Sequence, residues 1–198
     1  MRLKLPVIIC TAVFAVPGHA QEGIYVGLGA GSFDYDEPFN PGARGTVADT
    51  LDIYKLFGGF EVNQHLLIEV GYGKTSDLEY ATSFTVDPFG EIDYQYIADF
   101  TMTTARAVGQ LPLDWGILLA GLGFYSSEND FLEIADADCC GRATNGGTLS
   151  DSGATAMLGI EWRFGRLDTQ IGFRLEYEWW DIGVADTSAI GLALSYGF

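Results

Sequence analysis

The stretch "IGFRLEYEWW", residues 171–180, alternates apolar side chains with polar or small ones. Because successive side chains of a β-strand point to opposite faces, this period of two predicts a strand with one apolar and one polar face. Three charged side chains then share one face of a strand whose other face is wholly apolar. The apolar face carries Ile171, Phe173, Leu175, Tyr177 and Trp179, and the opposite face carries Gly172, Arg174, Glu176 and Glu178.

The same period of two recurs in seven other segments, so the sequence predicts eight strands. Short connections alternate with long acidic ones, which is typical of an antiparallel meander. We therefore expect an all-β, eight-stranded antiparallel up-and-down barrel in which the first and last strands pair. The seven segments are residues 24–29, 54–60, 66–73, 96–103, 118–124, 156–164 and 190–198. The short connections are residues 61–65, 110–115, 164–168 and 181–187, and the long ones are residues 33–50, 75–91 and 126–153.

The narrow interior of an eight-stranded barrel decides which face points inward. The apolar faces carry bulky side chains such as Trp162, Phe173 and Trp179, and such an interior is barely wide enough for side chains to fill. The opposite faces are rich in glycine and fit inside. The apolar faces then point to lipid, with aromatic residues near the strand ends as an interfacial girdle. The sequence therefore predicts a transmembrane β-barrel.

This orientation brings charges of both signs into a narrow lumen. Buried charges are tolerated only when they are paired and hydrogen-bonded, so we expect a structural ion-pair network that plugs the barrel, with help from Gln170 and Trp180. Arg106 is an open case. Strict alternation from Met102 turns it toward lipid, whereas a bulge in its strand would admit it to the lumen. The predicted network consists of Lys55, Glu69, Glu161, Arg163, Arg174, Glu176 and Glu178.

The first twenty residues have the form of a secretory signal peptide. Two basic residues precede a short apolar stretch, and Gly18 and Ala20 supply the small residues of a cleavage site. The apolar stretch is too short for a transmembrane helix, and small residues do not precede Cys10 as a lipoprotein would require. We therefore expect a cleaved signal over residues 1–20 and one outer-membrane β-barrel domain over residues 21–198.

The chain is strongly acidic. Its net charge of -17 at pH 7 becomes -19 when Arg2 and Lys4 leave with the signal, which excludes nucleic acid as an expected partner. Many of the acids lie in the long connections, where they indicate a solvated surface. Cation bridging to lipopolysaccharide phosphates and adhesion to a cationic partner are the sharper alternatives. The acids are Asp34, Asp36, Glu37, Asp77, Glu79, Asp87, Glu91, Glu128, Asp130, Glu133, Asp136 and Asp138.

Other motifs predict no cofactor, no metal and no catalytic residue. The "GLGAGS" of residues 27–32 looks like a dinucleotide loop, but no helix follows it. The "DADCCG" of residues 136–141 begins like a calcium loop, but Cys140 and Gly147 stand where that loop needs ligands. His65 is the only histidine after the signal and lies in a predicted turn, so a Ser/His mechanism fits poorly.

Cys139 and Cys140 are adjacent in a predicted extracellular loop. Metal-binding cysteines are usually separated by other residues. In an exported protein we expect these two to be oxidised, either to another chain or to each other. The mutual vicinal disulfide is the alternative that we favour, and the sequence assigns it no function.

The chain resembles the small outer-membrane barrels of Gram-negative bacteria, the OmpA/OmpX-like family, over nearly all of its length after the signal. Its clearest stretch is "YKLFGGFEVNQHLLIEVGYGK", residues 54–74, which is similar to the family's second hairpin. The terminal "SYGF", residues 195–198, resembles the signature that the barrel-assembly machinery reads, which makes Phe198 the expected assembly signal. The resemblance implies location in the outer membrane, among its lipid and lipopolysaccharide, and no peptidoglycan-binding domain.

We therefore expect a structural or interaction protein of the outer membrane that is not an enzyme and whose extracellular partner is unknown. One alternative is a small passive porin-like channel, which requires an unobstructed lumen. Another is an outer-membrane lipid-modifying enzyme, which requires a nucleophile and a base that converge near the outer rim. A structural barrel requires neither feature.

Overall fold

The computed structural model describes residues 23–37, 47–86, 90–137, 139–166, 169–182 and 185–198. The predicted signal, residues 1–20, lies outside the described residues, as do parts of five predicted connections. No helix in these ranges is long and apolar enough to cross a membrane. The described strands are β1 (Ile24–Glu37), β2 (Val47–Asn63), β3 (Leu66–Thr75), β4 (Leu78–Val86), β5 (Gly90–Leu113), β6 (Gly116–Ala137), β7 (Gly141–Arg166), β8 (Thr169–Ile182) and β9 (Ala185–Gly197).

The strands close into a ring. The sheet order is β3-β2-β1-β9-β8-β7-β6-β5-β4, and an additional pairing of β3 with β5 joins its two sides. β3 pairs with β5 as far as Lys74 and Thr101, and β4 then pairs with β5 from Leu78 and Ala98 outward. β4 thus continues the position that β3 holds in the ring. The prediction of an eight-stranded antiparallel barrel with β1 paired to β9 is therefore confirmed.

A pair of hydrogen bonds marks the point where β4 leaves the ring. The Ser76 amide donates to the Asp52 carbonyl oxygen at 2.8 Å, and the Asp52 amide donates to Ser76 Oγ at 3.1 Å. These bonds join β2 to Ser76, directly beyond the last β2–β3 pair, which is Ile53 with Thr75. Beyond them, β4 runs outward with β5 as its strand partner.

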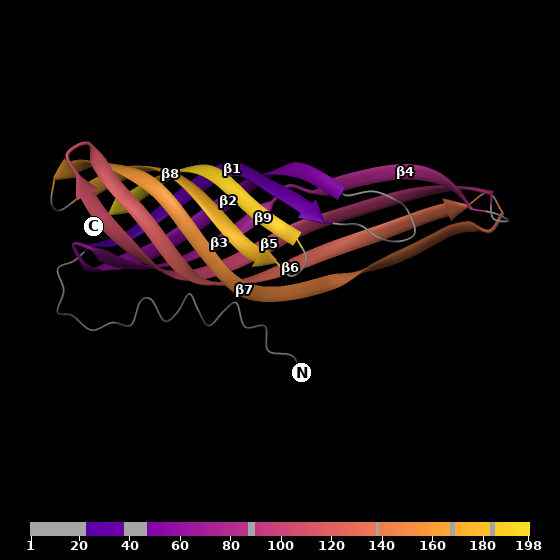
Figure 1. The fold of residues 1–198 in the computed structure, drawn as a ribbon, viewed down its shortest axis with the longest axis horizontal. Coiled ribbons are helices and arrows are strands. Elements are labelled where there is room, and N and C mark those ends of the chain that lie inside the picture. Colours follow the sequence, from indigo (N-terminus) through magenta and orange to yellow (C-terminus); the bar gives the residue numbers. More distant parts are fainter. Residues whose placement is uncertain (1–22, 38–46, 87–89, 138, 167–168, 183–184) are drawn as a thin grey trace.

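Two of the connections that the sequence predicts as loops are strands instead. β4 occupies most of residues 75–91, and the outer halves of β6 and β7 occupy residues 126–153. Figure 1 shows β4, β5, β6 and β7 extending well beyond the ends of β1, β2, β8 and β9. We call this part the projecting sheet: β4 with residues 90–99 of β5, 128–137 of β6 and 141–154 of β7.

Local chemistry explains why these segments are strands and not loops. Tyr, Phe, Thr and Ile recur at alternate positions, and such residues favour strands. The chain reverses in short turns, and Gly90 and Gly141 take φ angles of 80° and 81° there, a conformation that suits glycine. The polar side chains also bond across strands, as when Thr148 Oγ1 donates to Asp130. The prediction of long loops was wrong because polarity was read as a sign of irregular structure.

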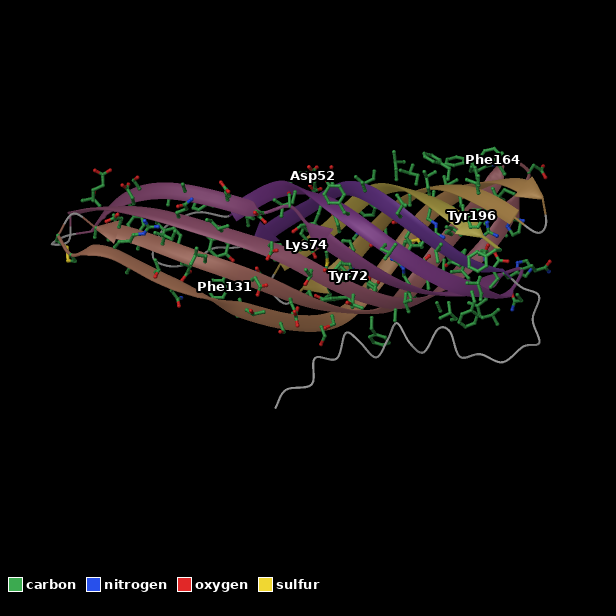
Figure 2. All side chains as sticks on the ribbon, turned by 180° about the vertical axis from the view of Figure 1, so that it is seen from behind. Asp52, Tyr72, Lys74, Phe131, Phe164 and Tyr196 are labelled. Atoms are coloured by element: carbon green, nitrogen blue, oxygen red, sulfur yellow. A yellow bond between two sulfur atoms is a disulfide. The ribbon has the colours of Figure 1, made fainter. Side chains whose placement is uncertain are left out.

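The outer wall of the ring is apolar and the inner wall is narrow. Leu122 and Phe124 are 72% and 75% exposed on the outside. Figure 2 shows Phe164 and Tyr196 near the end of the barrel opposite the projecting sheet, and both are exposed aromatic residues. Inside, a Cβ atom added at Gly27 would lie 2.2 Å from Phe57 Cζ and 2.8 Å from the Leu194 carbonyl oxygen, so a larger residue there would force the inner wall to shift.

β5 is an exception to the predicted orientation. Phe100 and Met102 belong to the face expected to point to lipid, but they are only 3% and 2% exposed and lie inside. Arg106 has the same parity and is therefore inside without a bulge, since the pairing of β5 with β3 and β6 runs without a register shift. Side chains of β5 therefore alternate strictly, as predicted, but Met102 was assigned to the lipid-facing side although it points into the lumen.

Two buried apolar clusters fill much of the interior. The outer cluster lies toward the projecting sheet, because Tyr80, Tyr96 and Phe131 of that sheet pack against it. It consists of Phe33, Leu51, Ile53, Leu78, Ala98, Phe100, Met102, Tyr125, Trp180 and Ala189. The second cluster consists of Tyr25, Phe57, Leu67, Val108, Leu119, Met157 and Ala193.

Candidate functional site

The structure places all seven residues of the predicted lumen network in ion pairs on the inner wall. They come from the four strands β2, β3, β7 and β8, whose inward positions meet across the narrow ring. Glu69, Glu161, Arg174, Glu176 and Glu178 are buried, and Lys55 and Arg163 are partly buried. The structure adds Arg106 from β5 and Glu61 from β2 to this set.

Glu69 lies at the centre of the charge cluster and is fully buried. Arg106 Nη2 lies 2.7 Å from Oε1 of Glu69, and Arg174 Nη1 lies 2.7 Å from Oε2. The Tyr25 hydroxyl also donates to Oε2 at 2.9 Å. Both oxygen atoms of this carboxylate therefore accept bonds from charged or hydroxyl donors, which is the condition for holding a buried charge.

The remaining pairs extend the cluster along β8. Arg106 also pairs with Glu178, and Lys55 pairs with both Glu178 and Glu176. Arg174 Nη2 lies 2.9 Å from Glu161 Oε2, and its Nη1 lies 3.7 Å from Glu176 Oε2. Because each base contacts at least two carboxylates, the pairs form one network and not a set of isolated bridges.

Aromatic rings line the same cluster. The Arg174 guanidinium carbon lies 4.8 Å from the centroid of the Phe57 ring and 5.9 Å from that of Tyr25. Contact between a guanidinium and an aromatic face stabilises a buried cation. The charge cluster and the second apolar cluster therefore occupy the same section of the lumen.

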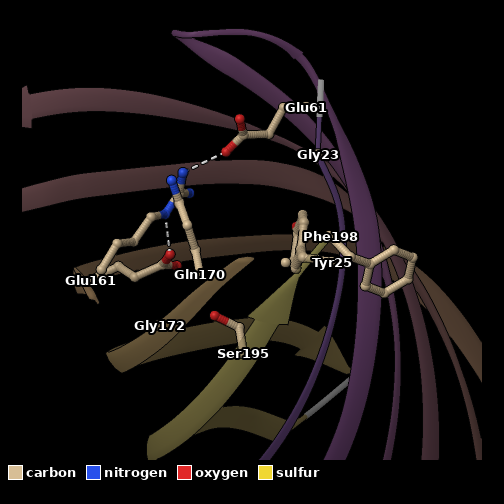
Figure 3. Close-up of a pocket in the computed structure, with 10 residues that line it drawn as sticks. Gly23, Tyr25, Glu61, Glu161, Gln170, Gly172, Ser195 and Phe198 are labelled. Atoms are coloured by element: carbon tan, nitrogen blue, oxygen red, sulfur yellow. Dashed lines mark hydrogen bonds and ion pairs between the residues drawn. The ribbon is translucent and has the colours of Figure 1, made fainter. Parts of the chain in front are cut away.

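Arg163 is the last base of the network toward the end of the barrel where Phe198 lies. It pairs with Glu61 and Glu161, and its Nη2 donates to Gln110 Oε1 at 2.9 Å. A cavity of about 220 Å³ lies beside it. Figure 3 shows Glu61 and Glu161 on opposite sides of the guanidinium that joins them, with Ser195 on the facing wall. Gln170 lines this cavity as well, together with Gly172.

The sequence reasoning missed several members of the lumen set. Tyr25, Glu61 and Gln110 were not predicted, and Arg106 was left open. Arg106 could have been found from its charge alone, because a lipid-facing arginine is costly in the middle of a membrane strand. Tyr25 and Gln110 show no such signal, since their partners come from strands distant in the sequence.

The projecting sheet has a chemistry of its own. Tyr94 donates to Glu133 Oε1 at 2.9 Å, and Asn145 Nδ2 donates to Glu133 Oε2 at 2.8 Å, so one carboxylate links β5, β6 and β7. Burial and this bond to Glu133 raise the pKa of Tyr94 above its ordinary value. The rings of Tyr96 and Phe131 stack with centroids 6.4 Å apart. The sheet carries nine Asp and Glu residues against one base, Arg142.

Both outer edges of the projecting sheet lack a neighbouring strand among the described residues: β4 pairs only with β5, and the outer part of β7 pairs only with β6. β7 pairs with β6 over residues 141–161, but with β8 only over residues 155–166. Residues 141–154 therefore present an open edge. They contain no proline and only two charged residues, Arg142 and Asp151. Proteins usually protect an exposed strand edge with proline, with charged side chains or with a covering segment.

The other residues singled out from the sequence lie at the ends of the molecule. Cys139 and Cys140 form a disulfide in the turn between β6 and β7, and both are exposed. The Phe198 amide donates to the Ile24 carbonyl oxygen at 3.0 Å, which ties the end of the chain to β1. His65 lies in the turn between β2 and β3, where its Nδ1 is 3.3 Å from the Gln110 carbonyl oxygen.

The described residues bring together no group of three His, Cys, Asp or Glu side chains that could hold a metal ion.

A closed antiparallel ring with an apolar outer wall and a charged lumen defines a transmembrane β-barrel of the outer membrane. The chain belongs to the outer membrane protein beta-barrel domain family, which it matches over residues 7–198. It therefore lies in the outer membrane, in contact with the lipids there. The predicted family and location are confirmed.

Solved structures share this fold. Ail, the attachment invasion locus protein of Yersinia pestis, matches with a TM-score of 0.56 and 13% identity in its complex with the heparin analogue sucrose octasulfate. Ail without that ligand matches with a TM-score of 0.54 and 14% identity, and in both cases 90% of this chain and 100% of Ail are covered. The N-terminal barrel of Pseudomonas aeruginosa OprF gives a TM-score of 0.47 at 13% identity, with 90% and 100% covered. No curated protein sequence matches the chain.

Proposed function

We propose that the protein is a surface-interaction protein, in which the barrel is an anchor and the projecting sheet is the docking surface. The observation that carries this proposal is the open edge of β7 at residues 141–154, held away from the membrane on a four-stranded sheet. An open strand edge can accept an extended segment of another protein through main-chain hydrogen bonds. The bonds across Glu133 link this edge strand to β6 and β5.

Charge selects the kind of partner. With nine acidic side chains against Arg142, the projecting sheet attracts a basic segment and repels an acidic one. The Ail structure contains a sulfated heparin analogue, but a polyanion of that kind does not suit the present sheet. We therefore propose a cationic polypeptide as the partner, and we place lipopolysaccharide contacts at the membrane rim and not on the sheet.

The occupied lumen supports the anchor role over the channel alternative. The apolar clusters and the ion-pair network fill the section of the barrel where a channel would need a continuous water path. His65 does not support the enzymatic alternative, because it lies in the β2–β3 turn with its Nδ1 next to the Gln110 carbonyl oxygen.

A shortened hairpin tests the proposal. Replacing residues 132–146 by an Asn-Gly turn removes the outer β6–β7 hairpin but leaves every pairing of the ring in place. We expect the wild-type protein in vesicles to bind a fluorescent alternating Lys–Val peptide and not an alternating Glu–Val peptide of equal length. The shortened variant keeps only residues 147–154 of the open edge, so it should bind the Lys–Val peptide several-fold more weakly, while its gel mobility should still change on boiling as that of a folded barrel does. Equal binding by both proteins would contradict the proposal.

A further inference from the structure

The Cys139–Cys140 disulfide does not stabilise the fold in the usual way. A disulfide stabilises mainly because it closes a loop in the unfolded chain, and two adjacent residues close no loop. The hairpin around it is held by other contacts, such as the Cys140 amide donating to the Ala137 carbonyl oxygen at 3.2 Å and the Asn145–Glu133 bond. Loop closure by this disulfide therefore contributes little to the stability of the fold.

The position of the pair suits a reaction with another molecule. The β6–β7 turn lies at the far end of the projecting sheet, away from the barrel (Figure 1). Cys139 and Cys140 are both exposed there. Exposed disulfides are generally the labile ones, because an incoming thiolate can reach a sulfur atom without any opening of the fold.

We propose that Cys139–Cys140 is a thiol-exchange site that captures a cysteine of an extracellular partner protein. A thiolate of the partner attacks one of the two sulfur atoms, and the bond between Cys139 and Cys140 breaks as the new bond forms. The released cysteine leaves as a thiolate and takes a proton from water. The partner sulfur is oxidised into a mixed disulfide while one cysteine of the pair is reduced, so no further oxidant or reductant is needed.

The acidic sheet sets which thiols react. Asp136 is exposed beside the turn, and Arg142 is the only base of the sheet. An attacking thiolate is itself an anion, so the surrounding negative charge slows thiols that carry further negative charge. A thiol that sits on a positively charged surface is drawn toward the site. The inference goes beyond the proposed docking edge, since the reaction uses the turn and not the edge of β7.

Two small thiols of opposite charge test the proposal. The folded protein is incubated at low salt with cysteamine or with 2-mercaptoethanesulfonate, and intact mass spectrometry follows the mixed disulfide. After correction for thiolate concentration, we expect cysteamine to react several-fold faster, and the difference to shrink in high salt because salt screens exposed charges. With excess thiol, phenylarsine oxide should capture the reduced pair, since a trivalent arsenical binds two neighbouring thiols.

Matched variants separate this site from the docking edge. The double variant Cys139→Ser, Cys140→Ser should keep its heat-modifiable mobility, still bind the alternating Lys–Val peptide, and take up no thiol. Asp136→Asn should reduce the preference for cysteamine. A folded wild-type protein that forms no mixed disulfide with either thiol would overturn the proposal, and so would equal rates at low salt. Neither result would affect the peptide-binding test of the β7 edge.

Discussion

At the scale of single residues, the lumen contains a network of charged side chains and not a set of separate one-to-one ion pairs. The network holds four bases, Lys55, Arg106, Arg163 and Arg174, against five carboxylates, Glu61, Glu69, Glu161, Glu176 and Glu178. Arg106, Arg163 and Arg174 each lie between carboxylates from different strands, and Lys55 lies between two carboxylates of β8. Loss of one base therefore removes a counter-charge from two or more carboxylates at once.

Arg174→Ala is the most severe of these changes. Arg174 contacts Glu69, Glu161 and Glu176 and is only 1% exposed, so its removal should lower the free energy of unfolding by about 3 to 5 kcal/mol. Urea unfolding in phospholipid vesicles, followed by tryptophan fluorescence, measures the loss. Lys74→Ala is the control, because Lys74 pairs with Asp99 on the exposed surface and its removal should leave the unfolding midpoint unchanged. Similar losses in both variants would contradict the buried-network argument.

Tyr25→Phe isolates one hydrogen bond of the same network. The variant keeps the ring beside Arg174 but removes the hydroxyl that donates to Glu69. Because Arg106 and Arg174 still hold both oxygen atoms of Glu69, the free energy of unfolding should fall by only about 1.5 kcal/mol. The same unfolding assay applies. A loss as large as that of Arg174→Ala would mean that the hydroxyl, and not the arginine, holds the carboxylate.

The residues also show what a sequence can and cannot reveal about this lumen. Arg174, Glu176 and Glu178 could be assigned to the inner wall because their strand is apolar on its other face. On β5 the apolar rule fails, since Phe100 and Met102 belong to a buried cluster and apolar residues occur on both walls. A charge is the better guide, because lipid excludes it, and Arg106 would have set β5 correctly. The partner of each charge was not predictable, since it depends on the register between strands.

At the scale of whole strands, β9 closes the ring. It pairs with β1 from Tyr25 and Gly197 outward, and the Phe198 amide adds a bond to Ile24. We propose that Phe198 is also the assembly signal, as its aromatic terminal position suggests. Deleting Phe198 should therefore reduce the amount of folded protein in outer membranes far more than the shortened β6–β7 hairpin does.

The comparison is made in cells that express each variant at the same level. Folded protein is measured in outer-membrane fractions by its gel mobility before and after boiling. The shortened hairpin removes residues that contact only the projecting sheet, so its assembly should match that of the wild type. Equal assembly of both variants would contradict the closing role of the final residue.

The number of strands in the ring was predictable, but their lengths were not. Period-two patterns in the membrane region are strong because lipid and lumen differ sharply in polarity. Beyond the membrane both faces of a strand meet water or another polar face, and the pattern weakens. Residues 128–137 and 141–154 therefore look like a loop although they pair along their whole length. Their acidic character was visible, but their projecting form was not.

At the scale of the whole molecule, the lumen decides between an anchor and a channel. A channel needs a continuous water path along the lumen. The lumen is instead filled by the apolar cluster around Phe33 and, next along the barrel, by the charge network around Glu69. The aromatic rings of Phe33 and Trp180 pack in that apolar cluster with their centroids 5.7 Å apart. We therefore expect the purified protein in a planar lipid bilayer to give no stable, uniform single-channel currents. Arg174→Ala is the informative comparison, because loss of the base should loosen the network and produce irregular openings where the wild-type protein gives none. Steady currents of uniform size from the wild-type protein would show an open path and would favour the passive-channel function over the anchor.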